Sequence, residues 1–235
     1  NPIPEKIATG EIGYGFNYRT LSVMLNGYYT QWMDKSVTKA IGSWNGPRAC
    51  IPNIDARHMG IELEASYQPL EWLRVYGFFT IGNWRWTNDV NFTLFNEQNE
   101  KIGEYHAYIK NLHVGNAPQT SAMLGLSCMP VSGLTLGVDF NYYGRHYADF
   151  AAADRTDEKD RAEAWKLPDY STVDLNLNYD FKMGTFQGQL FGNVNNLFNR
   201  KYISDALDGS DHTRETAVVW YGFGITWTAG LRISF

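Results

Sequence analysis

The sequence predicts an all-β protein, a transmembrane antiparallel up-and-down β-barrel of which this chain supplies about nine to ten strands. Three observations predict it. Segments of alternating polarity recur along the chain, long and short connections alternate between them, and one parity of each segment carries no charge. Strict alternation is the period of a β-strand, whose successive side chains point to opposite faces.

The composition agrees with β structure and argues against nucleic acid as a partner. Aromatic residues make up 15% of the 235 residues, and 22 residues are glycine. Both enrichments are typical of β architecture. The net charge is −5 and no basic stripe is present, whereas binding to nucleic acid depends on such a stripe.

The first four predicted strands share an uncharged parity. Its members are, in order, Ile12, Tyr14, Phe16 and Tyr18 in Glu11 to Arg19; Leu21, Val23, Leu25 and Tyr29 in Leu21 to Asp34; Ile61, Leu63, Ala65 and Tyr67 in Met59 to Tyr67; and Leu73, Val75, Phe79 and Ile81 in Leu73 to Trp84. Several of these segments reach the roughly 9 to 11 residues that a tilted strand needs to cross a bilayer.

The remaining five predicted strands repeat the pattern. Their uncharged parities are Ala122, Leu124 and Leu126 in Ser121 to Met129; Leu134, Leu136, Val138, Phe140 and Tyr142 in Leu134 to Tyr147; Val173, Leu175, Leu177, Tyr179 and Phe181 in Thr172 to Phe181; Phe186, Leu190 and Val194 in Phe186 to Asn196; and Tyr221, Phe223, Ile225, Trp227, Leu231, Ile233 and Phe235 in Tyr221 to Phe235.

The connections sort by length. Those after the first, third, fifth and seventh segments are short, and those after the second, fourth, sixth and eighth are long and polar. Barrels of the bacterial outer membrane have this asymmetry, with short periplasmic turns and long external loops. A soluble β-sandwich has no reason to sort its loops in this way, and so many long loops are unusual in a compact domain.

The opposite parity carries charge. Its charged members are Glu11, Arg19, Glu62, Glu64, Arg74, Asp139, Arg145, Asp174, Asp180 and Arg232. A Lys or Arg on a lipid face costs about 2 to 4 kcal/mol at the bilayer midplane, whereas a polar lumen accepts either sign. The uncharged parity ends in tyrosines, which favour the membrane interface. Lipid on one side and a wet lumen on the other is therefore predicted.

Nine strands is an odd number, and single-chain bacterial barrels have even counts. With up-and-down connections the first and last of nine strands run parallel, so they do not pair as antiparallel neighbours. An unpaired edge in lipid is not tolerated. We therefore expect further strands of the same wall to precede Asn1.

Four stretches resemble one family. "NPIPEKIATGEIGYGF", "NAPQTSAMLGLSCMP", "NVNNLFNRKY" and "TAGLRISF" are similar to segments of TonB-dependent outer-membrane receptors, and "NVNNLFNRKY" is the most specific of them. The resemblance implies a 22-stranded barrel in the bacterial outer membrane, plugged by an N-terminal domain. It implies energised uptake of a scarce nutrient of the siderophore, cobalamin, haem or oligosaccharide class.

The same resemblance makes residues 1–235 the C-terminal portion of the barrel, without the plug, the energy-coupling box or the earlier strands. The implied partners are the rest of the receptor, outer-membrane lipid, the TonB complex through the absent N-terminal part, a surface lipoprotein and a small-molecule nutrient. Phe235, with Ile233 and Leu231 on its parity, resembles the signal read by the barrel-assembly machinery.

Two sets of residues are candidates for the site. Aromatic residues near the outer strand ends could stack on a ligand or belong to the interfacial girdle, and they are Trp44, Trp84, Trp86, Phe150, Trp165 and Trp220. Charged residues of the lumen parity are expected to pair with one another or with the plug, and they are Glu62, Glu64, Arg74, Asp139, Arg145, Asp174 and Asp180.

No metal or other cofactor is expected. The acidic stretches Ala153 to Trp165 and Asp205 to His212 lack the spacing of a calcium loop, and a solvated external loop explains them. The histidines are His58, His106, His113, His146 and His212, and none has a spacing that indicates a haem ligand. Cys50, in a predicted loop, and Cys128, on a predicted strand, are expected to lie at opposite ends of the wall.

Two alternatives stay open. A self-contained porin or adhesion barrel would need a tenth strand, for which "EKIGEYHAYIKNLHV" and the residues before Glu11 are candidates. A soluble β-sandwich that binds a ligand is the second alternative. An enzyme is not expected, because the chain contains no nucleophile elbow, phosphate-binding loop or dinucleotide fingerprint.

Overall fold

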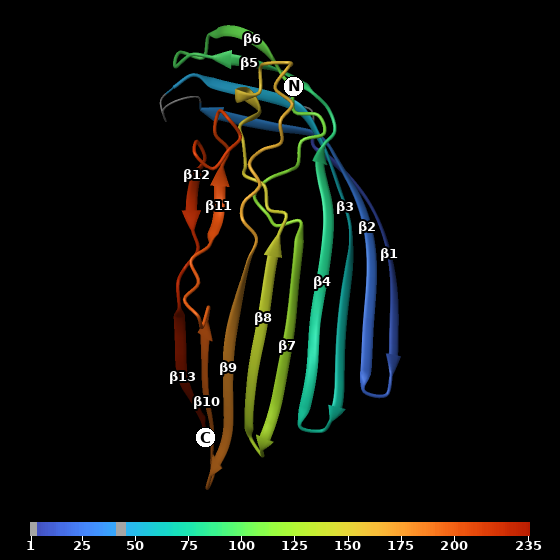
Figure 1. The fold of residues 1–235 in the computed structure, drawn as a ribbon, viewed down its shortest axis with the longest axis vertical. Helices are drawn as coiled ribbons and strands as arrows, with labels where there is room; N and C mark the ends of the chain where they lie inside the picture. The colour runs from blue at the N-terminus through green and yellow to red at the C-terminus, as the bar shows by residue number, and fades with distance from the viewer. Residues whose placement is uncertain (1–3, 41–45) are drawn as a thin grey trace.

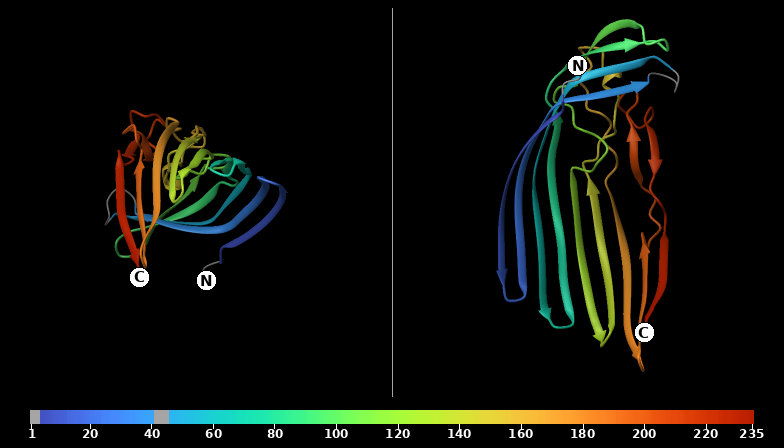
Figure 2. Two further views of the ribbon diagram at one scale, coloured as in Figure 1. Left: turned by 90° about the horizontal axis from the view of Figure 1, so that it is seen from below. Right: turned by 180° about the vertical axis from the view of Figure 1, so that it is seen from behind.

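The computed structural model describes residues 4–40 and 46–235. Within those residues, nine antiparallel strands form a curved wall (Figures 1 and 2) in the order β1–β2–β3–β4–β7–β8–β9–β10–β13. Their bounds are Lys6–Tyr18 (β1), Leu21–Ala40 (β2), Arg48–Leu70 (β3), Leu73–Trp86 (β4), Thr120–Val131 (β7), Leu134–Gly144 (β8), Tyr170–Met183 (β9), Phe186–Asn195 (β10) and Thr226–Ser234 (β13). All nine predicted strands are present, and the up-and-down order is confirmed.

β2 and β3 are longer than predicted. The stretch expected to be a loop between them is mostly strand, because β2 and β3 continue to pair up to Ala40 and Arg48. The alternation of polar and apolar residues did not indicate the longer strands, because it is interrupted by two register shifts around Lys35. Asp34, at the same place, has a φ of 59°. Cys50 consequently lies in β3 and not in a loop.

Two hairpins lie outside the wall (Figure 1). β5 (Val90–Phe95) pairs with the outer end of β3 and with β6 (Lys101–Ala107), while β4 pairs directly with β7. The candidate tenth strand therefore exists as β6 but does not enter the wall. β11 (Ile203–Leu207) pairs with β12 (Val218–Tyr221). The predicted last strand is wrong at its start, since it is interrupted between β12 and β13.

The uncharged parity of the wall is exposed. Ile12 is 80% exposed and Leu124 59% exposed, and large apolar side chains of the other wall strands are exposed in the same way. No second layer covers this face in the part of the chain that the structure describes, which excludes a β-sandwich for that part. An apolar face that extends over all nine strands, with charge confined to the opposite parity, is typical of a wall that spans a membrane.

The register places tyrosines at two levels. Tyr18 pairs with Leu21, and Leu21 with Tyr67, so both tyrosines lie beside the short turns. Tyr29 and Tyr142 lie nearer the long loops, opposite Gly10 and Ser171. Amphipathic rings at two heights are typical of the two membrane interfaces.

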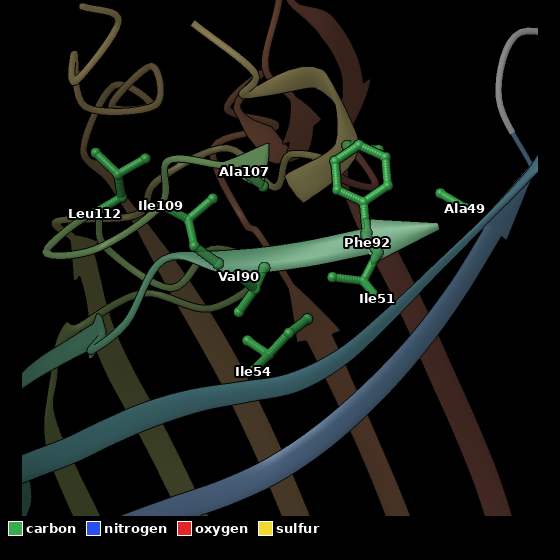
Figure 3. Packing of buried hydrophobic residues seen from close by; sticks show 9 residues of the cluster. Ala49, Ile51, Ile54, Val90, Phe92, Ala107, Ile109 and Leu112 are labelled. Atoms are coloured by element: carbon green, nitrogen blue, oxygen red, sulfur yellow. The ribbon is translucent and has the colours of Figure 1, made fainter. Parts of the chain in front are cut away.

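The buried core lies beyond the wall. Figure 3 shows it between β3, β5 and the segment after β6, and its members are Ala49, Ile51, Ile54, Val90, Phe92, Ala107, Ile109, Leu112 and Ala153. The helix η1 (Ala152–Asp154) packs against it. No helix of the described residues is long and apolar enough to cross a membrane.

Candidate functional site

We call the region beyond the outer ends of the wall strands the outer cap. It consists of residues 34–40, 46–55, 87–119, 145–169 and 196–225, which include both hairpins and η1. The ends of β2 and β3 support one half of the cap, and Figure 1 shows β5 and β6 lying across them. The other half consists of the segments 145–169 and 196–225, which have little strand structure and are joined by a main-chain bridge at Asp149 and by side chains.

A buried arginine joins these two segments. The Arg155 guanidinium donates to Asp208 Oδ2 (2.7 Å) and to the Ala162 carbonyl (2.9 Å), and the Arg155 and Asp208 side chains are each 2% exposed. His212 lies between two carboxylates, 2.6 Å from Asp208 and 3.0 Å from Asp160. A buried charge pair is stable only with further hydrogen bonds, and here the other oxygen of Asp208 accepts from the Trp165 N–H (2.9 Å).

Two further ionic contacts fix the segment 145–169 to the end of β4 and the segment after β6. Arg85 donates to Glu163 (2.9 Å), and the other oxygen of Glu163 accepts from the His113 main-chain N–H (3.0 Å). Arg161 binds both carboxylate oxygens of Asp89 at 2.8 and 3.0 Å. Bidentate geometry makes the second contact directional as well as attractive.

Acidic residues of the cap have pKa values below the usual range. Burial by itself would raise the pKa of Asp160. The hydrogen bond and charge of His212 and the charge of Arg155 outweigh burial, so the pKa of Asp160 is lowered. The pKa of Glu163 is lowered in the same way, against burial, by His113 and Arg85. These carboxylates therefore remain charged and hold the cap together at neutral pH.

Two cap histidines are held in the neutral form. Burial lowers the pKa of His113, although Glu163 opposes the change. Burial also lowers the pKa of His146, whose two ring nitrogens are buried without a hydrogen-bond partner. Neither arrangement resembles a metal site, and the described residues contain no cluster of three or more His, Cys, Asp or Glu side chains suited to a metal ion.

The "NVNNLFNRKY" stretch forms a corner between β10 and the cap. Asn196, 4% exposed, accepts from the Arg200 N–H (2.9 Å) and donates to the Arg200 carbonyl (2.9 Å). Its own N–H donates to Asp174 (2.7 Å), and Asn199 accepts from the Ile225 N–H (3.0 Å). Both asparagines have φ near +50°. The corner thus satisfies main-chain groups just beyond the outermost pair of the β10–β13 ladder, Asn195 with Thr226.

The aromatic candidates do not form one surface. Trp86 and Phe150 pack on the buried core, Phe150 also lies under the Arg155 guanidinium, and Trp165 packs on a second buried cluster. Trp84 donates its indole N–H to the Tyr28 hydroxyl (2.9 Å). Trp220 is 47% exposed on β12. Trp44 lies outside the described residues.

A tyrosine stack was not predicted. Tyr143 and Tyr170 are cross-strand partners on the lumen parity of β8 and β9, with ring centroids 5.0 Å apart, and Tyr202 stacks on Tyr170 at 4.1 Å. Strand parity alone could have indicated Tyr143, but Tyr170 lies before the predicted start of its strand and Tyr202 in a loop. The three rings together form an aromatic surface at the outer mouth of the lumen.

Five of the seven candidate lumen charges bind neutral groups in the described residues, where Glu62 and Glu64 form no side-chain hydrogen bond. Asp139 accepts from Tyr76 (2.7 Å) and Asn176 (3.2 Å), and Asp174 accepts from Asn141 (2.8 Å). The remaining contacts are Arg74 with Ser66, Arg145 with the Gly82 carbonyl and Asp180 with Gln189. Within the described residues these charges bind hydroxyl, amide and main-chain groups, and their pairing with a plug stays a prediction.

An antiparallel wall with one apolar and one polar face, and with its long loops assembled at one end, is typical of an integral β-barrel protein of a membrane. Comparison with known proteins specifies the class. The sequence model described as "TonB dependent receptor-like, beta-barrel" matches residues 2–197. The chain belongs to this family and is an integral part of a bacterial outer-membrane protein.

Several known proteins are similar to it. An Escherichia coli K12 ferrichrome outer membrane transporter and phage receptor is 32% identical over 80 residues, which are 34% of this chain and 9% of the relative. In fold, the chain resembles the copper transporter OprC (TM-score 0.64, 18% identity, 98% of this chain, 32% of that chain). It also resembles BauA, the ferric preacinetobactin receptor of Acinetobacter baumannii. The TM-score is 0.63 and the identity 18%, and the match covers 97% of this chain and 29% of that chain.

The chain spans about a third of the length of these structures. At this level of identity the likeness concerns the fold. The relatives are described as receptors and transporters, so the expectation that the chain is not an enzyme agrees with its family.

Proposed function

We propose that the chain forms wall and outer cap of a receptor that takes up a scarce nutrient across the outer membrane, energised by the TonB complex. The observation that carries the proposal is the wall itself, with one parity exposed to lipid, a polar lumen parity and an assembled cap at the long-loop end. Membership of the receptor family supports the same function.

In this proposal residues 1–235 are the C-terminal portion of the barrel, and the plug and earlier strands are its partners within one receptor. Two observations support it. The chain covers 32% of the copper transporter OprC, and in the described residues β1 and β13 each pair on one side only. A self-contained porin or adhesion barrel would need a closed wall, and β6 does not contribute a tenth strand to it.

We propose a metal chelate of the siderophore class as the nutrient. Relatives whose names state a cargo support this class, among them the ferrichrome transporter of Escherichia coli and the ferric citrate transporter FecA. Cobalamin, haem and oligosaccharide are the competing classes. A surface lipoprotein that delivers the nutrient is a further partner in the proposal, and so is the barrel-assembly machinery, through Phe235.

The proposed contact surface for the nutrient is the tyrosine stack at the outer mouth of the lumen, together with Trp84. The stack offers a broad ring face bordered by phenol hydroxyls, and Trp84 lies on the lumen parity of β4, beside Tyr28. Aromatic faces of this kind bind planar or apolar chelates, while their hydroxyls supply hydrogen bonds.

Binding of ferric siderophores, haem, cobalamin and oligosaccharides to the intact receptor tests the proposal. A ferric siderophore should bind most tightly, and Tyr202→Ala should weaken it about two- to tenfold, the usual range for one aromatic contact. Trp72→Ala, at an inner turn, is the matched control and should change nothing. Tightest binding of another class would refute the siderophore, and uptake that persists without TonB would refute the energised mechanism.

A further inference from the structure

An apolar groove crosses β8, β9, β10 and β13 on the lipid-facing side of the wall. Its volume is about 620 Å³. Its floor lies where Gly192 pairs with Ala229 of β13 and with Leu177 of β9. A Cβ atom added to Gly192 would meet only the Thr228 carbonyl within 4 Å, at 3.4 Å. The missing side chain therefore leaves open space above the strand.

The sides of the groove are hydrocarbon. They are formed by Leu136, Leu175, Leu177, Leu190, Val194 and Trp227. All six belong to the uncharged parity that faces the bilayer, so the groove is continuous with the lipid-facing surface. Neighbouring strands are about 4.8 Å apart, which is close to the width of a hydrocarbon chain. A bilayer acyl chain is the occupant that this surface meets.

A cation lies at the outer end of the groove. The Arg200 guanidinium donates to the Ser171 hydroxyl (3.4 Å), and Ser171 shares the parity of Leu175 on β9. Among the described residues this is the only side-chain hydrogen bond of Arg200. Leu175 lies four positions along the strand from Ser171, a distance of about 13 Å. This offset suits a lipid whose headgroup lies above its acyl chain.

The surroundings of Arg200 are those of a membrane interface. Phe198 is 74% exposed and Lys201 is also exposed. The nearby carboxylate of Asp169 is engaged by the Tyr142 hydroxyl (2.8 Å) and by Lys166 (3.5 Å). Arg200 and Lys201 are thus available to a phosphate. Aromatic and basic side chains at the headgroup level are the usual anchors of membrane proteins.

We propose that this groove binds a phosphate-bearing lipid, with an acyl chain above Gly192 and a phosphate at Arg200. Arg200 lies at the long-loop end of the wall, and in outer-membrane barrels that end faces outward. We therefore assign the site to the lipid A type of glycolipid in the outer leaflet, which carries several acyl chains and phosphates. A glycerophospholipid shares the chemistry but belongs to the opposite leaflet.

Native mass spectrometry of the delipidated intact receptor tests the assignment, with lipid A, phosphatidylglycerol and uncharged diacylglycerol as probes. Lipid A should bind most tightly. Gly192→Leu should weaken it about tenfold, equivalent to about two methylene groups left uncovered. Arg200→Gln should weaken both charged lipids about fivefold and leave diacylglycerol unchanged. If Gly192→Leu does not fold, Ala229→Leu fills the same floor.

Gly10→Leu is the matched control, because Gly10 lies on the lipid parity of β1 and a Cβ there meets nothing within 4 Å. It should leave lipid A binding unchanged. An equal loss in this control, or equal affinity for all three lipids, would overturn the site. Tighter binding of phosphatidylglycerol than of lipid A would overturn its assignment to the outer leaflet.

Discussion

Asn196 shows how one residue turns the chain from wall to cap. Its side chain both accepts and donates at Arg200, and it also donates to the Phe223 carbonyl (3.3 Å). An exposed asparagine with the same φ could adopt this turn without such bonds. Asn196 of the "NVNNLFNRKY" stretch therefore has a structural role. Its side-chain atoms form hydrogen bonds with main-chain groups and are not free to bind a ligand.

We predict that Asn196→Ala destabilises the receptor by about 1 to 3 kcal/mol, because buried main-chain groups lose their partners. Urea unfolding of the receptor in lipid vesicles, followed by tryptophan fluorescence, measures the change. Asn195→Ala is the control, since Asn195 is exposed and bonds only at the surface with Thr226 and Asn193. Equal effects of the two substitutions would contradict the assigned role of the corner.

Among the elements, the two irregular segments of the cap depend on Arg155. We predict that Arg155→Met lowers the local stability of segments 145–169 and 196–225 by about 3 to 5 kcal/mol, because the buried Asp208 then loses its guanidinium partner. Amide hydrogen exchange of residues 203–208 reports this opening. Arg155→Met combined with Asp208→Leu should recover part of the protection.

Arg214→Met is the matched control for this substitution. Arg214 pairs with Glu215 at 3.2 Å, but both side chains are largely exposed, and such pairs contribute at most about 1 kcal/mol. Exchange in residues 203–208 should stay as in the unaltered protein. If both arginine variants exchange alike, the buried pair is not what joins the segments.

The cap should also loosen in acid. The pKa values of His113 and His146 are lowered by burial, so the opened cap binds more protons than the closed one. The closed cap therefore keeps its full stability above a pH of about 6.5. It loses stability as the pH falls toward the lowered pKa values of the two histidines. A second loss below pH of about 4 follows from the lowered pKa values of Asp89, Asp160 and Glu163.

Hydrogen exchange of residues 145–169 between pH 8 and pH 5, corrected for intrinsic rates, measures the first step. His146→Phe should reduce the step, because the phenyl ring occupies a similar space and binds no proton. Wall strands β8 and β9 serve as the internal reference. A step of unchanged size in His146→Phe would show that this histidine has no part in it.

Sequence patterning predicted the wall better than the cap. Alternation is reliable where each face has one solvent, as from Thr172 to Phe181, and all nine wall strands were found. Beyond the membrane both faces of β2 and β3 contact protein or water, so alternation ends while the strands continue to Ala40 and Arg48. The tyrosine stack and the Arg155 network join distant segments, and local spacing does not encode such contacts.

At the scale of the whole molecule, the wall separates lipid from water by parity. We predict that Leu175→Arg destabilises the folded barrel by about 2 to 4 kcal/mol and that Asn176→Arg costs far less. Leu175 lies on the exposed uncharged parity, whereas Asn176 donates to Asp139 on the other side. Urea unfolding in vesicles compares the two, and a smaller cost for Leu175→Arg would reverse the assigned faces.

The two longest strands have a mechanical consequence. β2 spans 20 residues, about 66 Å of chain at 3.3 Å per residue, and its ladder with β3 bends but does not break on leaving the bilayer. This half of the entrance therefore continues the strand ladder of the wall. The opposite half is joined by a main-chain bridge at Asp149, a small apolar cluster and the Arg155 ion pair. Local opening of the cap is therefore expected first in segments 145–169 and 196–225, which lack such a ladder.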